Sequence, residues 1–175
     1  MKNIFTTFLL AITLFNCNST PQDTEKETKP VSIGFGINDE NEKVNLIPGD
    51  SKLIEIWQEY LAAHEANDLD KIYEMDADDI TIYRIDGSVG KGKDEHREYL
   101  ENWFENSTPK WEAKWCIANT VENIDGSLET WLTTGSKFSD FVDGEEILTN
   151  TVADFKFEDE KVKSIYIYSR NVAKE

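Results

Sequence analysis

The feature that most constrains the fold is the alternation of apolar and polar residues in the last third of the chain. From Trp111 to Ile117, apolar side chains recur at every second position, and Val121 continues the same phase. A period of two is typical of strands with one buried face. Three more strand-like segments follow, at 128–138, 147–158 and 162–169. Turn residues separate the four segments: Asp125-Gly126, Asp143-Gly144 and Asp159-Glu160. The pattern predicts four antiparallel strands.

The middle of the chain has the periodicity of helices. Ser51 is a plausible N-cap for a helix that runs to Asn67, with one apolar side made of Leu53, Trp57, Tyr60, Leu61 and His64. A second helix follows Asp68, residues 80–85 form a strand, and a third helix runs from Asp94 until Pro109 stops it. This order predicts an α+β domain, with three helices packed on one face of a curved, mainly antiparallel sheet.

The N-terminus has the features of an export signal. Lys2 precedes an apolar run from Ile4 to Phe15, which is shorter than the roughly 20 residues that cross a bilayer. The run ends in Leu-Phe-Asn-Cys, which resembles a bacterial lipobox. The resemblance implies that residues 1–16 are a lipoprotein signal peptide and that Cys17 carries a diacylglyceryl group and a third acyl chain such as palmitate. An ordinary secretory signal with an incidental Cys17 is the alternative.

Such a lipid anchor determines the expected location. Each buried methylene contributes about 0.8 kcal/mol, so two or three acyl chains hold the protein on the membrane without spanning it. Asn18 follows the cysteine, in place of the aspartate that often marks inner-membrane retention. We therefore expect a lipoprotein of the outer membrane, on its periplasmic or surface face, with the lipid bilayer as a partner.

Residues 17–50 are expected to form the lipidated N-terminus and an acidic, flexible linker. The segment is too polar to bury a core, and as a coil of its length it would reach roughly 30 Å from the membrane. One exception is an alternation of Val31, Ile33, Phe35 and Ile37, which would suit a short edge strand. Residues 51–175 then make the folded domain.

Charge and cysteine content exclude several classes of function. The chain has 18 basic and 35 acidic residues and a net charge of −17, which becomes −18 when residues 1–16 leave with one lysine. Nucleic acid and anionic lipid head groups would be repelled by such a surface, so no nucleic acid partner is expected. Cys116 is the other of two cysteines, so acylation of Cys17 precludes an intramolecular disulfide. A buried structural thiol is the expected role of Cys116.

Two stretches resemble a known superfamily. WQEYLAAHEANDLDKIYEMDADDITIY (57–83) and VADFKFEDEKVKSIYIYSRN (152–171), with glycines before the third helix, look like the nuclear transport factor 2-like superfamily, in its SnoaL-like (polyketide-cyclase-like) branch. The likeness covers about 51–172. It implies a cone whose pocket lies between the first and third helices and the concave face of the sheet. It is evidence for fold more than for function.

The resemblance also tests one specific chemistry. Ketosteroid-isomerase-like members of the family carry a tyrosine on the first helix, a carboxylate base at the end of the first strand and a protonated acid on a later strand. On this sequence the tyrosine falls on Tyr60, the base on Arg84 and the second acid on Ala153. Arginine does not take a proton from carbon at neutral pH, and alanine donates no hydrogen bond. Steroid-isomerase chemistry is therefore disfavoured.

The remaining cone residues are mostly aromatic and predict a site for a small, mostly apolar ligand. The expected pocket residues are Trp57, Tyr60, His64, Trp103, Trp115, Thr151 and Phe155, and Thr149, Ala153, Trp111 and Ile117 are expected on the same side. An enzyme is the alternative: a lyase, isomerase or hydrolase with His64 as general base, aided by Tyr60 four residues earlier. His64 and the tryptophans can equally be structural core residues, and a structural lipoprotein without ligand is the third alternative.

Other candidate sites are weaker. His96 takes a place where relatives commonly carry an aliphatic residue, and it can simply lie at a helix margin. Asp76, Asp78 and Asp79 lack the glycine and distal glutamate of an EF-hand, so we expect turn and capping roles, no metal and no cofactor. Tyr166 and Tyr168 would lie on the outer sheet surface if Ile165 and Ile167 point inward, which favours a homodimer through that face; plain solvent exposure is the alternative.

Overall fold

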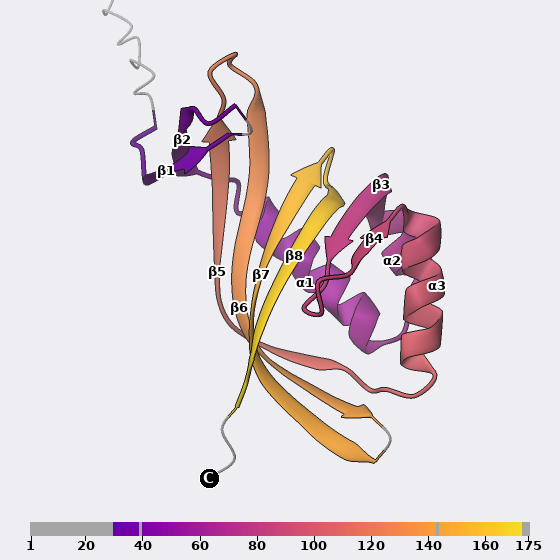
Figure 1. Ribbon diagram of the computed structural model, residues 1–175. Coiled ribbons are helices and arrows are strands. Elements are labelled where there is room, and N and C mark those ends of the chain that lie inside the picture. Colours follow the sequence, from indigo (N-terminus) through magenta and orange to yellow (C-terminus); the bar gives the residue numbers. More distant parts are fainter. Residues whose placement is uncertain (1–29, 39, 143, 173–175) are drawn as a thin grey trace, which may run out of the picture.

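The computed structural model describes residues 30–38, 40–142 and 144–172, and it consists of three helices packed against one curved sheet (Figure 1). The helices are α1 Lys52–Glu65, α2 Leu69–Met75 and α3 Lys93–Phe104. The signal peptide and Cys17 lie outside the described residues, as does Asp143 of one predicted turn. In the part of the chain that is described, no helix is long and apolar enough to cross a membrane.

The sheet has eight strands among the described residues, in the order β1-β2-β5-β6-β7-β8-β3-β4. Their bounds are β1 Gly34–Ile37, β2 Lys43–Pro48, β3 Asp76–Tyr83, β4 Val89–Lys91, β5 Lys110–Glu122, β6 Leu128–Val142, β7 Glu145–Glu158 and β8 Lys161–Asn171. All neighbours are antiparallel except β3 and β8, which are parallel. The long strands β5 to β8 are strongly twisted, and the helices lie on one side of them, as Figure 1 shows. This side is the concave face of the sheet.

The four C-terminal strands and the three helices predicted from the sequence are present, because their local signals agree with the fold. The strand predicted at 80–85 is also present, as β3, with bounds shifted to Asp76–Tyr83. Asp159 and Glu160 both have positive φ, 49° and 64°, as a two-residue hairpin turn requires. Helix α2 begins at the predicted Asp68, whose side chain accepts a hydrogen bond from the Lys71 backbone. Helix α1 differs in detail: Asp50, one residue before Ser51, accepts the bond from Lys52 N.

The linker predicted for residues 17–50 is shorter than expected. Strand β1 contains the second half of the predicted alternation, Phe35 and Ile37, and it pairs with β2, which was not predicted from the sequence. Strand β2 in turn pairs with β5, from Asn45 opposite Glu122 to Pro48 opposite Asn119. Gly49 lies directly against the β5 backbone, where a side chain would overlap Asn119. The β1–β2 hairpin therefore extends the sheet.

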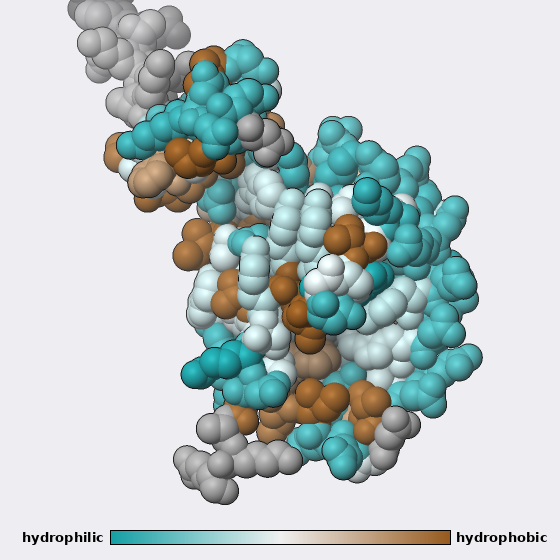
Figure 2. Space-filling view, viewed as in Figure 1, coloured by the Kyte–Doolittle hydropathy of each residue, from teal (hydrophilic) through white to brown (hydrophobic). Residues whose placement is uncertain are grey.

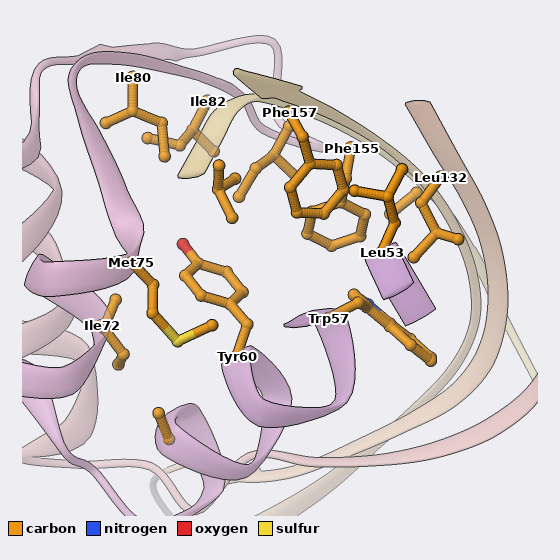
Figure 3. Packing of buried hydrophobic residues seen from close by; sticks show 14 of the residues in the cluster. Leu53, Trp57, Tyr60, Ile72, Met75, Ile80, Ile82, Leu132, Phe155 and Phe157 are labelled. Atoms are coloured by element: carbon orange, nitrogen blue, oxygen red, sulfur yellow. The ribbon is translucent and has the colours of Figure 1, made fainter. Parts of the chain in front are cut away.

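The core lies between α1 and the sheet. Trp57 and Tyr60 project from α1 toward Phe155 and Phe157 of β7, while Ile72 and Met75 close the side next to α2 (Figure 3). Leu53 and Leu132 complete the end near Trp57. The apolar side predicted for α1 is thus the side that packs, and it fixes the helix across the concave face.

The last strand presents two different faces. Ile165 and Ile167 of β8 point to the concave side, and Tyr168 lies on the outer surface with 59% of its area exposed. Tyr166 stacks on Tyr83 of β3, with ring centroids 4.3 Å apart. The faces are as the alternation predicts, and the homodimer remains an expectation.

Candidate functional site

A cavity of about 350 Å³ lies between α1, α3 and the concave face of the sheet. Its volume falls at the lower end of the range for small-molecule sites. Most of its wall is aromatic or aliphatic, and six of the predicted pocket residues line it, namely Trp57, Tyr60, His64, Trp103, Thr151 and Phe155. Figure 2 shows hydrophilic residues over α2 and α3, and hydrophobic residues at the middle and lower part of the same face.

Trp115 does not lie in the cavity, and this corrects the sequence analysis. The register of β5 on β6 shifts between Ala113 and Trp115, which marks a β-bulge. Beyond it the faces are exchanged, so Trp115 and Ile117 are 45% and 53% exposed on the outer side. Cys116 packs against the core instead. A strict period of two cannot anticipate one extra residue, because a single insertion turns every later side chain to the opposite face.

Three buried polar side chains form a hydrogen-bonded chain at the cavity wall. Tyr60 Oη donates to Asp76 Oδ1 over 2.8 Å. His96 Nδ1 lies 2.7 Å from Asp76 Oδ2. Asp76 is 2% exposed, and its carboxylate is thus held between two donors in the core. Burial raises the pKa of Tyr60 well above its ordinary value, helped by the negative charge of Asp76, so the tyrosine stays protonated and keeps donating.

His64 has a different environment from His96. Its Nδ1 is 2.8 Å from the carbonyl oxygen of Tyr60, which can only accept, so Nδ1 carries the proton. Burial lowers the pKa of His64 to about 3, while the bond to Tyr60 opposes this and the neighbouring His96 adds to it. His64 is therefore a neutral side chain at ordinary pH.

His96 has the arrangement of an oriented base. A carboxylate accepts at its Nδ1, so the proton of the neutral ring lies on Nδ1 and Nε2 has a free lone pair. His96 lines the cavity. Because its Nδ1 is engaged by Asp76, Nε2 is the ring nitrogen that is left to interact with a bound molecule. The ring of His64 lies beside it, 6.1 Å between centroids.

A second buried carboxylate, Asp140 of β6, has a structural role. Its oxygens accept from Trp103 Nε1 at 3.1 Å and from the backbone N–H groups of Thr108 and Phe141, each at 2.8 Å. These bonds hold the end of α3 and the loop after it against the sheet. With three donors on two oxygens, Asp140 needs no ligand to satisfy its charge.

The two positions that decided against steroid-isomerase chemistry also line the cavity. They are Arg84, just after β3, and Ala153 on β7. Neither side chain supplies a carboxylate. Among the described residues, Asp140 is the acid in the cavity lining, and Asp76 acts on the cavity through its hydrogen bonds to the lining residues Tyr60 and His96. Among the described residues, no group of three or more His, Cys, Asp and Glu side chains is placed to hold a metal ion.

The roles of His96 and Asp76 were not predicted from the sequence. Asp76 does end α2, in agreement with the capping role expected for it, but its side chain turns into the core. The available signal was His96 itself, a polar residue on the apolar side of a predicted helix. No local pattern connects residues 20 apart in sequence, so the pair becomes visible only when α3 packs against β3.

Comparisons with known proteins agree with this architecture. No family model matches the sequence, and neither does any curated protein. Among solved structures, an LEH-like epoxide hydrolase from M. tuberculosis is similar at TM-score 0.58 and 14% identity, over 69% of this chain and 84% of the other.

Two other solved structures have the same fold. One is described as a SnoaL-like polyketide cyclase from Shewanella denitrificans, at TM-score 0.58 and 10% identity, over 69% of this chain and 92% of the other. The second is a nuclear transport factor 2-like protein from Burkholderia xenovorans, at TM-score 0.53 and 14% identity, over 68% and 89% of the two chains. Identities this low show the fold alone. The chain therefore has the nuclear transport factor 2-like cone fold, in the form that SnoaL-like proteins share.

Proposed function

We propose that the domain binds a small, mostly apolar molecule in its cavity and transfers a proton to or from it, with His96 as the general acid–base. The observation that carries the proposal is the Asp76 carboxylate, which holds His96 in one tautomer at the wall of an apolar cavity. A base fixed by a buried carboxylate, beside space for a reactant, is the arrangement that proton transfer requires.

This assignment replaces His64 with His96 as the base. His64 has its pKa lowered to about 3 and no carboxylate partner, so it gains little by taking a proton. His96 has Asp76 to stabilise the imidazolium that forms on proton uptake. Tyr60 acts as a positioning residue, because its hydroxyl holds the other oxygen of the same carboxylate. The Nε2 of neutral His64 can accept a hydrogen bond and so orient a hydroxyl of the bound molecule.

The reaction class follows from what the wall contains. An oriented base in an apolar cavity favours removal of a proton from carbon, as in an isomerase or lyase, or activation of a water, as in a hydrolase. Two of the similar structures are named as a polyketide cyclase and an LEH-like epoxide hydrolase. Their names support the class and leave the substrate open.

A generic carbon acid tests the proposal without knowledge of the substrate. The compound 5-nitrobenzisoxazole is small and apolar, and loss of its C3 proton to a base opens the ring to a coloured phenolate. We expect the wild-type domain to accelerate this opening and His96→Gln to reduce the rate constant by 100-fold or more. His64→Gln is the matched control and should keep most of the rate. Equal rates in His96→Gln and the wild type would refute the base assignment.

Ligand binding without turnover is the second candidate, and the aromatic wall favours it. Tryptophans 57, 103 and 111 all line the cavity, so a bound apolar molecule would change their fluorescence. If a panel of apolar compounds quenches this emission while the coloured product never forms faster than in buffer, a carrier role replaces the enzymatic one. Failure of every compound to bind would favour a structural lipoprotein.

We propose further that the domain is anchored in the outer membrane of a bacterial cell envelope through acylated Cys17. The lipobox-like Leu-Phe-Asn-Cys after a short apolar run supports this, and the acidic chain would be repelled by anionic lipid head groups, so the acyl chains would provide the attachment. Growth with an alkyne analogue of palmitate should label the wild type, and Cys17→Ser should abolish both the label and the membrane fraction. A labelled Cys17→Ser variant would contradict the anchor.

A further inference from the structure

We propose that the molecule bound in the cavity carries a carboxylate and that Arg84 binds it. This inference rests on the proposed small-molecule function, since it names the chemical class of the ligand. It starts from a cation in the wall of an otherwise apolar cavity. Arg84 lines the cavity at the end of β3, close to where Ile85 and Tyr99 reach the surface.

The guanidinium of Arg84 is held in place but not hydrogen-bonded. It lies over the ring of Tyr99, with Cζ 4.0 Å from the ring centroid. Its Nε and Nη2 are buried, and neither has a hydrogen-bond partner in the described part of the chain. Gly90 of β4 makes room for it, since a Cβ there would lie 2.5 Å from Nη2. The fold therefore positions this side chain and leaves its donors unused.

Arg84 is half-buried, and two of its guanidinium nitrogens are buried without a hydrogen bond, which is unfavourable for the protein alone. Stacking on Tyr99 offsets only part of this cost. Asp86 is the nearest acidic side chain in sequence, and its pKa is lowered chiefly by hydrogen bonds from Ser88, with Arg84 as a weaker cause. No ion pair within 4 Å joins the two residues. A ligand oxyanion would supply the missing acceptor.

The other charged groups of the wall cannot compensate Arg84. The carboxylate of Asp76 is engaged by Tyr60 and His96. Asp140 is engaged by Trp103 and two backbone N–H groups. Arg84 is thus the charged lining residue, among those described, whose charge has no partner.

A carboxylate fits this site better than a phosphate. The planar guanidinium matches a carboxylate in a two-bond fork. A phosphate dianion needs more donors than one arginine, and the net charge of −17 opposes a second negative charge. The apolar wall then accommodates the rest of the molecule. The expected ligand is an apolar acid with a single carboxylate.

The position of Arg84 relative to the base adds a constraint. The guanidinium of Arg84 lies over the ring of Tyr99, which is three residues after His96 on α3. The side chains of Tyr99 and His96 are therefore neighbours one helical turn apart. A carboxylate bound over Tyr99 places the atoms next to it beside His96. The reacting carbon should therefore lie within a few bonds of the carboxylate.

A matched pair of probes tests the inference. The compounds are 2-naphthoate and its neutral analogue 2-naphthamide, which share one ring system and differ in charge. Binding is measured by isothermal titration calorimetry on the protein without residues 1–16 and with Cys17→Ser. We expect the wild type to bind naphthoate more tightly than naphthamide, and Arg84→Met to weaken naphthoate at least 10-fold while changing naphthamide less than 3-fold.

Two controls keep the result interpretable. Arg97→Met removes an exposed arginine of α3 that is paired with Asp70 and Glu101, and it should leave both affinities unchanged. Arg84→Lys keeps the charge but loses the fork, so naphthoate should bind at an intermediate strength. Equal wild-type affinities for the two probes, or equal losses in Arg84→Met, would overturn the carboxylate inference and leave the cavity as a neutral site. Failure of both probes to bind the wild type would overturn the proposed small-molecule function as well.

Discussion

The carboxylate of Asp76 connects Tyr60 and His96 across the core. Its Oδ1 accepts from the tyrosine hydroxyl at 2.8 Å, and its Oδ2 lies 2.7 Å from His96 Nδ1. One residue at the junction of α2 and β3 thus joins α1 to α3. These two hydrogen bonds stabilise the packing of the helices and orient the imidazole of His96 at the cavity. The stability of the fold and the proposed chemistry therefore both depend on Asp76.

Asp76→Asn should destabilise the protein by about 1–3 kcal/mol. An amide has one oxygen for two donors, so either Tyr60 or His96 loses its acceptor inside the core. Urea unfolding followed by tryptophan fluorescence measures the loss. Asp79→Asn is the control on the same strand, because this exposed carboxylate pairs with Lys163 at the surface and should change stability by less than about 1 kcal/mol. Equal effects of the two substitutions would contradict the buried bridge.

His64 should make stability depend on pH. Its pKa is lowered to about 3 in the folded protein, against an ordinary value of 6.5, so the unfolded chain binds a proton first as the pH falls. The contribution of His64 is therefore complete above pH 6.5 and decreases toward pH 3, with a slope of up to about 1.4 kcal/mol per pH unit. Carboxylates titrate in part of the same window, so the difference between wild type and His64→Gln isolates the effect. A constant difference between pH 7 and 4 would refute a neutral buried His64.

Gly135→Ala should destabilise the protein by about 1–3 kcal/mol. Gly135 of β6 lies opposite Trp115 of β5, next to the β-bulge. A Cβ at Gly135 would overlap the indole ring, which must then leave its place on the outer face. In a Trp115→Ala background the same substitution should cost much less, because the ring is gone. Urea unfolding of the four variants of this cycle gives the coupling. Simple additivity would show that Trp115 does not cover Gly135.

The outer face of β7 and β8 is the expected dimer contact. Tyr168 is exposed there, and Val152 lies opposite it in the register of the two strands. Sedimentation equilibrium on the protein without its signal peptide and with Cys17→Ser should give a dimer that Tyr168→Lys dissociates, since burying an ammonium group is unfavourable. A monomer at high micromolar concentration would count against the contact.

Much of the fold could be predicted because its local signals agree with the final packing. The helical spacing of Leu53, Trp57 and Tyr60 matches the face that covers the sheet. The polar pair Asp159-Glu160 forms the turn that its residues favour. Periodicity and turn chemistry act within a few residues, so elements that depend on them are visible in the sequence.

The parts that could not be predicted depend on contacts distant in sequence. Strand β2 has weak signals and is held by pairing with β5, more than 70 residues later. Trp115 faces outward because of one extra residue in β5. Asp76 has the sequence context of a helix end, and only the packing of α1 and α3 around it gives it Tyr60 and His96 as partners. Tertiary contacts, rather than local propensity, decide these positions.

The most direct test of the account is nitrogen-15 NMR of the histidine side chains, since the chain has only two. At pH 7.5 the Nδ1 of each ring should carry a proton, and His96→Gln assigns the signals. Addition of 2-naphthoate should then shift the Nε2 resonance of His96 more than any signal of His64. A His96 ring with no proton on Nδ1, or one whose Nε2 signal is unmoved at saturating naphthoate, would contradict the claim that Asp76 holds this base at the ligand cavity.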